Sequence, residues 1–203
     1  MSTAAVKTYS PDEYLALEVQ SELRHEYYRG EIFLMTGGSS AHSLIQINLV
    51  RLIANHLNGQ ACRAYNCDMR VKVKSSGLYT YPDLSIACPP IEIEKKGAAE
   101  TLVNPAVLFE VLSPSTANYD RSKKFDQYSL IPSLREYVLV SQDEPRVEKR
   151  VRATNGTWAL SVASGLHETL RVESIDCVLR LDEIYAKVEF EPAATSQPQE
   201  PSR

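Results

Sequence analysis

The sequence predicts a protein of mixed α/β (α+β) class, in which a mixed central sheet is flanked by helices. Two short apolar runs rich in strand-forming residues, 81–86 and 108–112, are typical of buried strands. A long amphipathic pattern from about Ser40 to Asn58 predicts a helix that Gly59 ends. With 203 residues, 43% of them hydrophobic and 24% charged, the chain suits one globular domain.

The N-terminal part predicts a helix followed by a hairpin. Residues 10–13 (Ser-Pro-Asp-Glu) form a capping box with proline at the first helical position. Residues 24–36 predict two strands that turn at Arg29-Gly30. We expect residues 1–8 to be an N-terminal extension and 9–190 to be the domain.

The remaining elements follow from local patterns. Residues 69–74 alternate as a half-buried strand does, and residues 89–105 are expected to be a long connection. A strand at 135–140 precedes an antiparallel pair around Asn155-Gly156. We expect a closing helix at 181–188, and then a disordered tail at 191–203, which is rich in Pro, Ser and Gln.

Two acidic residues lie inside the apolar runs. Asp83 and Glu110 would each be costly to bury unless paired, hydrogen-bonded or bound to a cation. Taken singly, Pro82-Asp83 also suits a turn, and Glu110 also suits an edge strand facing water. Together they suit neighbouring strands that present both carboxylates to one cation.

A helix after the second acidic residue offers a cationic group. A Ser/Pro-rich loop leaves the strand, and a helix is expected from about Asp120. Lys124 and Tyr128 are one turn apart and share a face, whereas Lys123 is expected to face solvent. We therefore expect Lys124 to point towards Glu110.

These motifs resemble a known family, the Uma-type restriction-endonuclease-like proteins of the PD-(D/E)XK nuclease superfamily. The resemblance rests on Pro82-Asp83, on Glu110 to Thr116, on the helix with Lys124 and Tyr128, and on Glu136-Tyr137. It implies a restriction-endonuclease-like core and a metal-dependent DNA endonuclease. One departure is Leu112, where the superfamily motif has lysine; the resemblance implies that Lys124 takes that role.

The resemblance also implies the ligand set. Asp83, Glu110 and the Val111 carbonyl would hold Mg²⁺ or Mn²⁺, which prefer hard oxygen ligands. It includes the Gly30-Glu31 pair, so Glu31 is a candidate third catalytic acid, although on sequence alone it suits a solvated hairpin position. The long helix has no acidic residue, which leaves Gln46 or Glu31 to complete the site and His42 as a further candidate.

The charged residues give mixed support for nucleic-acid binding. Arg70, Lys72 and Lys74 form an outward basic row that suits either a phosphate track or a charge-guarded edge strand. Arg121 is a further candidate contact to DNA. The net charge of −4 favours an alternative function, a weakly active or inactive nuclease-fold module that binds nucleic acid or a protein. A small-molecule phosphodiesterase is a third, weaker candidate.

Composition sets the remaining expectations. The four cysteines form no zinc motif and are expected to be reduced. No apolar run is long enough to span a bilayer, and no secretory signal is present, so a cytoplasmic location is expected. The sequence leaves a homodimer open.

Overall fold

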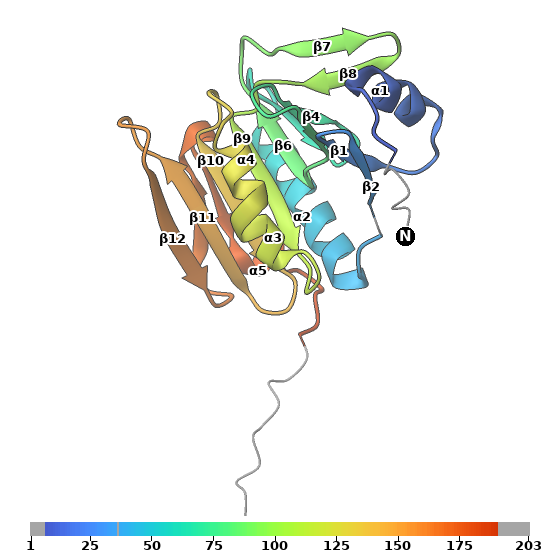
Figure 1. Cartoon of the computed structure of the whole chain (residues 1–203). Coiled ribbons are helices and arrows are strands. Elements are labelled where there is room, and N and C mark those ends of the chain that lie inside the picture. The colour runs from blue at the N-terminus through green and yellow to red at the C-terminus, as the bar shows by residue number, and fades with distance from the viewer. Residues whose placement is uncertain (1–6, 36, 191–203) are drawn as a thin grey trace, which may run out of the picture.

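The computed structural model describes residues 7–35 and 37–190, and its centre is a mixed six-stranded sheet (Figure 1). The strand order is β12-β11-β10-β9-β6-β3, in which only β9 and β10 are parallel neighbours. This confirms the predicted mixed central sheet. Its strands are β3 (Arg63–Asn66), β6 (Leu84–Ala87), β9 (Val107–Leu112), β10 (Glu136–Ser141), β11 (Arg146–Arg152) and β12 (Trp158–Ser164).

A second six-stranded sheet, which the sequence did not predict, adjoins the first. Its order is β2-β1-β5-β4-β8-β7. The expected connection at 89–105 contains the hairpin β7–β8, which turns at Gly97 with a φ of +58° that suits glycine. The strands are β1 (His25–Tyr28), β2 (Glu31–Leu34), β4 (Val71–Val73), β5 (Leu78–Thr80), β7 (Ile93–Lys96) and β8 (Ala99–Leu102).

Helices cover both faces of the central sheet (Figure 1). On one face, α2 (Ser40–His56) packs with α5 (Leu181–Ile184), which is shorter than the predicted 181–188. The other face carries one helical segment made of α3 (Ala117–Tyr119), a π-helical turn η1 (Asp120–Lys124) and α4 (Phe125–Tyr128). A small sheet of β13 (Thr169–Val172) and β14 (Cys177–Arg180), linked by a 3₁₀ turn η2 (Glu173–Ile175), completes the domain.

Strand β9 is buried along its whole length because helices lie on both sides of it. Phe109 and Val111 pack with α2, whereas Leu108 and Leu112 pack with α4. Side chains alternate along a strand, so Glu110 lies on the α4 face. The apolar run with one internal acidic residue is therefore a central strand, and not an edge strand facing water.

The first helix, α1 (Pro11–Gln20), covers the second sheet. Its Tyr14 is fully buried and stacks on Tyr27 of β1, with ring centroids 5.0 Å apart. The predicted capping box is present: the Glu13 amide donates to Ser10 Oγ at 3.3 Å, and Glu13 Oε2 accepts from the Ser10 amide at 2.7 Å.

Ser10→Ala is expected to lower the free energy of unfolding by about 1 kcal/mol, because it removes this N-cap. The loss should lower the stability of the whole domain, because α1 packs into the core through Tyr14. Urea unfolding measures the change. Ser10→Thr, which keeps the hydroxyl, is the control, and an equal loss in both variants would contradict the capping explanation.

The cysteines differ from expectation. Cys62 and Cys88 form a disulfide that links the ends of β3 and β6, while Cys67 and Cys177 are free. The prediction that all four are reduced is therefore wrong for this pair. Within the described residues, no helix is long and apolar enough to cross a membrane.

Candidate functional site

The two acidic residues singled out by the sequence line one cavity of about 400 Å³. Asp83 directly precedes β6, and Glu110 lies in β9. The antiparallel register pairs Leu84 with Phe109, so Asp83 and Glu110 are adjacent across the two strands, as predicted. The cavity, called here the site cavity, is further lined by hairpin β1–β2, the start of α2, the loop at 113–116 and the η1 turn.

Asp83 is held by three groups. Its Oδ1 accepts from Gln46 Nε2 at 3.0 Å, and its Oδ2 accepts from the Val111 amide at 2.7 Å. His42 Nε2 lies 3.4 Å from Oδ2. Hydrogen bonding to Asp83 raises the pKa of the His42 imidazole, against the effect of burial. His42 and Gln46, the two candidates from the long helix, therefore both contact Asp83.

Glu110 is paired with the predicted cation. Its Oε1 accepts from Tyr128 OH at 2.8 Å and lies 3.0 Å from Lys124 Nζ. Burial raises the pKa of the Glu110 carboxyl to about 8, although Lys124 opposes the shift. Burial by itself would lower the pKa of Lys124, but the carboxylates around it, Glu110 foremost, raise that pKa well above its usual value. Lys124 therefore remains an ammonium group.

The π-helical turn brings two charged side chains inward. Asp120 and Lys124 are both buried, with Asp120 Oδ1 3.4 Å from Lys124 Nζ. Lys123 is exposed, as expected. Single π-turns inside helices occur often at functional sites.

The hairpin supplies an acidic residue that the sequence reasoning missed. Glu26 Oε1 lies 3.5 Å from Lys124 Nζ. Glu31, the predicted third acid, is exposed at the start of β2 and lines a different cavity, with Lys7 and Tyr9. The signal for Glu26 was its alternation with Tyr27: Tyr27 packs under α1, so Glu26 points to the opposite face.

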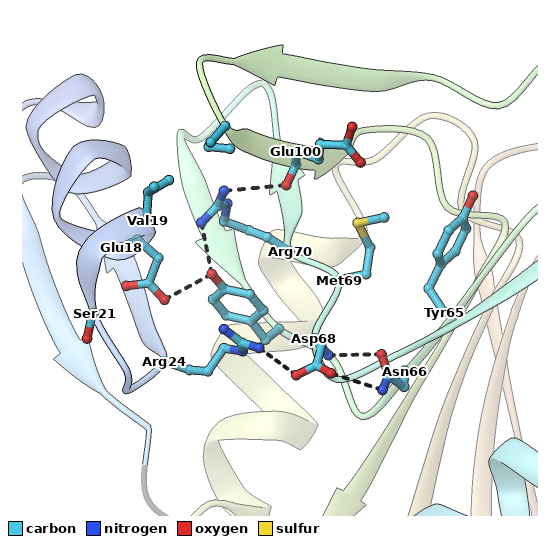
Figure 2. Close-up of a pocket in the computed structure, with 13 residues that line it drawn as sticks. Glu18, Val19, Ser21, Arg24, Tyr65, Asn66, Asp68, Met69, Arg70 and Glu100 are labelled. Atoms are coloured by element: carbon cyan, nitrogen blue, oxygen red, sulfur yellow. Dashed lines mark hydrogen bonds and ion pairs between the residues drawn. The ribbon is translucent and has the colours of Figure 1, made fainter.

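The predicted basic row faces outward at Lys72 and Lys74 but not at Arg70. Arg70 is 5% exposed and lies before β4, where its side chain donates to Tyr81 OH at 2.8 Å and to Thr101 Oγ1 at 3.1 Å. Figure 2 shows Arg70 inside a cavity beside α1, with Glu18 and Glu100 around it. The expectation that Arg70 faces outward is therefore wrong.

The other candidate DNA contacts are paired with carboxylates. Lys72 Nζ lies 2.8 Å from Glu94 Oε2, and Lys74 Nζ lies 3.3 Å from Glu92 Oε2. Arg121 donates from two nitrogens to Glu148, at 3.0 and 3.1 Å. Phosphate contact by these three side chains would therefore compete with existing ion pairs.

The donor set suits a hard cation. Within the described residues, no group of three or more His, Cys, Asp or Glu side chains is arranged to hold a metal ion. The site cavity instead offers the Asp83 and Glu110 carboxylates together with the Val111 carbonyl. The Val111 amide donates to Asp83, and the Val111 carbonyl points to the same side of the strand as that amide. Mg²⁺ is commonly bound through one or two carboxylates and retains several waters. The residues present therefore fit Mg²⁺ or Mn²⁺.

Comparisons with known proteins agree with the fold and the motifs. The model of the family described as "Uma2: Putative restriction endonuclease" matches residues 11–182. Two proteins of Synechocystis, "Uncharacterized protein slr1290" and "Uncharacterized protein sll1609", are 35% and 34% identical; the matches cover 89% and 81% of this chain and 93% of each relative.

A solved structure has the same fold. The crystal structure of "a putative nuclease belonging to DUF820 from Anabaena variabilis" superposes with a TM-score of 0.70 at 22% identity. The match covers 87% of this chain and 97% of that one. With its nuclease-like fold and a family model that spans most of its length, the chain belongs to the Uma2 family of restriction-endonuclease-like proteins.

Proposed function

We propose that this protein is a metal-dependent endonuclease that hydrolyses phosphodiester bonds of DNA. The observation that carries the proposal is the convergence of Asp83, Glu110 and Lys124 in one cavity. The two acids come from neighbouring strands and the lysine from a helix packed on the same sheet face as Glu110. Membership of the Uma2 family supports the same reaction class.

The charge balance of the site cavity favours a bound cation. Four carboxylates, those of Glu26, Asp83, Glu110 and Asp120, line it beside one buried ammonium group. Crowded carboxylates disfavour one another's ionised form, and a buried site magnifies that cost. A divalent cation at Asp83 and Glu110 would remove the excess negative charge.

Each side chain has a role that follows from its contacts. Gln46 and the Val111 amide fix the orientation of the Asp83 carboxylate, and the His42 imidazole lies beside that carboxylate. Tyr128 fixes Glu110 through its hydroxyl. A divalent cation bound there would lower the pKa of a coordinated water and neutralise charge on the phosphate.

Lys124 would act on the reacting groups directly. Its ammonium group stays charged among Glu26, Glu110 and Asp120, and it lines the cavity in which the phosphate would lie. A fixed cation in a buried site stabilises the negative charge that develops at phosphorus and orients the attacking water. Tyr128, fully buried, positions Glu110 through the hydrogen bond that its hydroxyl donates.

The alternative is a nuclease-fold module without activity. It is favoured by the ion pairs that occupy Lys72, Lys74 and Arg121 and by the net charge of −4. The two functions differ in one measurable respect, because only the endonuclease needs the Asp83 carboxylate for cleavage.

Asp83→Asn is expected to reduce Mg²⁺-dependent cleavage of plasmid DNA at least about 100-fold, because it removes a ligand of the proposed cation. The fold should be almost unaffected. The oxygen of the introduced Asn side chain can still accept from the Val111 amide. Its NH₂ group can donate to Gln46 Oε1 once the Gln46 side-chain amide has flipped. Mg²⁺ should raise the melting temperature of the wild type more than that of the variant.

Asp176→Asn is the matched control, since Asp176 is an exposed carboxylate paired with Arg171 and lies outside the site cavity. It should cleave and respond to Mg²⁺ as the wild type does. Undiminished cleavage by Asp83→Asn would refute the assigned ligand. Absence of cleavage of plasmid, single-stranded DNA and RNA by the wild type would favour the inactive module.

A further inference from the structure

A second cavity, of about 640 Å³, adjoins the site cavity. The two share three lining residues: Glu26, Phe33 and Tyr119. The second cavity is completed by Tyr28, Leu78, Lys123, Asp126 and Gln127. Because three of its eight lining residues are aromatic, it is called here the aromatic cavity.

The hairpin register explains why the aromatic side chains gather there. Glu26 pairs with Phe33 across β1 and β2, so their side chains share one face of the hairpin. Tyr28 lies two residues after Glu26 and shares that face as well. This face looks towards the helical segment, which contributes Tyr119 and Gln127, and the Gln127 amide reaches Tyr28 OH at 3.5 Å.

The aromatic side chains at the shared wall are exposed. Phe33 is 47% exposed and Tyr119 38% exposed, although both are large apolar side chains. Exposed aromatic side chains beside a nucleic-acid path act as stacking platforms for bases. Lys123, Asp126 and Gln127 add hydrogen-bonding groups of both kinds, which suit the polar edge of a base.

The charges argue against a paired duplex as the main ligand. Duplex binding depends on many free cationic contacts to phosphates. Arg70 is buried, and Lys72, Lys74 and Arg121 are paired with carboxylates. Stacking can supply binding energy that these four side chains do not supply, and it needs bases that are not already stacked in a helix.

We propose that the aromatic cavity receives the base of an unpaired nucleotide next to the phosphate in the site cavity, so that the preferred substrate is single-stranded or locally unpaired DNA. This inference rests on the proposed function for the identity of the ligand. It adds the strand state of the DNA and the residues that select it, Phe33 and Tyr119.

The test measures binding separately from cleavage. Fluorescence anisotropy would compare a single-stranded oligonucleotide, its duplex, and the same strand with abasic positions, with Ca²⁺ as an added cation that takes oxygen ligands. We expect tighter binding to the single strand than to the duplex or the abasic strand. Phe33→Ala and Tyr119→Ala should each weaken single-strand binding about 5- to 150-fold and leave duplex binding unchanged.

Two kinds of variant keep the result interpretable. Phe33→Tyr and Tyr119→Phe keep the aromatic ring and should retain affinity. Leu160→Ala removes an exposed apolar side chain from β12, outside both cavities, and should leave single-strand binding unchanged. Equal affinity for single strand and duplex, or for base-containing and abasic strands, would overturn the proposal.

The outcome is distinguishable from that of the endonuclease proposal. Asp83-dependent cleavage of single-stranded DNA that does not respond to Phe33→Ala or Tyr119→Ala would leave the endonuclease intact and refute the stacking cavity. Single-strand binding that needs Phe33 and Tyr119, without cleavage of any DNA, would support the cavity and refute hydrolysis.

Discussion

Lys124→Met is expected to lower the free energy of unfolding by about 3–5 kcal/mol, the usual cost of removing one partner from a buried ion pair. The side chain is 6% exposed, and its ammonium group lies within 3.5 Å of Glu26, Glu110 and Asp120. Methionine fills similar space but leaves these carboxylates without a cation. If the proposed function is correct, cleavage should fall as well.

The neighbouring residue provides the control. Lys123→Met removes the same charge from an exposed position and should change stability by no more than about 0.5 kcal/mol. The double variant Lys124→Met/Glu110→Gln should recover part of the loss, because it also removes the closest uncompensated charge. Chemical denaturation measures all three variants. Equal stability of Lys123→Met and Lys124→Met would show that the buried ion cluster contributes nothing.

Loss of the Cys62–Cys88 disulfide is expected to cost about 3–4 kcal/mol, since the bond closes a loop of sequence separation 26 in the unfolded chain. The double variant Cys62→Ala/Cys88→Ala removes the bond without leaving a free partner thiol. Its stability should not respond to a reductant, whereas that of the wild type should fall when dithiothreitol is added.

Urea unfolding with and without dithiothreitol tests this expectation. Cys67→Ala is the control, because Cys67 is a free cysteine near the same strands. A wild type whose stability is indifferent to the reductant would show that the thiols are reduced, as the sequence first indicated.

The sequence predicted the parts of the site that depend on local spacing. Lys124 and Tyr128, one helical turn apart, both reach Glu110 Oε1. Asp83 and Glu110 were predicted on adjacent strands because each interrupts an apolar run, and the sheet register places them so. Their role as metal ligands stays a prediction.

The predictions that were wrong concern residues whose positions depend on contacts between distant segments of the chain. The hairpin register puts Glu26 and Glu31 on one face, and only the docking of the hairpin beside the η1 turn places Glu26, and not Glu31, in the site cavity. The alternation at 69–74 suggested an outward Arg70, but the strand starts at Val71 and Arg70 turns inward to Tyr81. The cysteine pair depends on the alignment of β3 with β6, which no local pattern reveals.

The site cavity draws its charged groups from both sheets, and this links its chemistry to local unfolding. Glu26 belongs to β1, which joins β5 through a single register pair, Tyr27 with Tyr79, whereas Glu110 belongs to the central sheet. A detached hairpin would withdraw Glu26 from Lys124 and Phe33 from the cavity wall. Any ligand that binds the protein more tightly with the hairpin docked than with it detached must therefore slow hydrogen exchange at the amides of residues 25–34. Exchange in the hairpin then reports whether the site is occupied, although the hairpin does not contain the main acidic residues of the site.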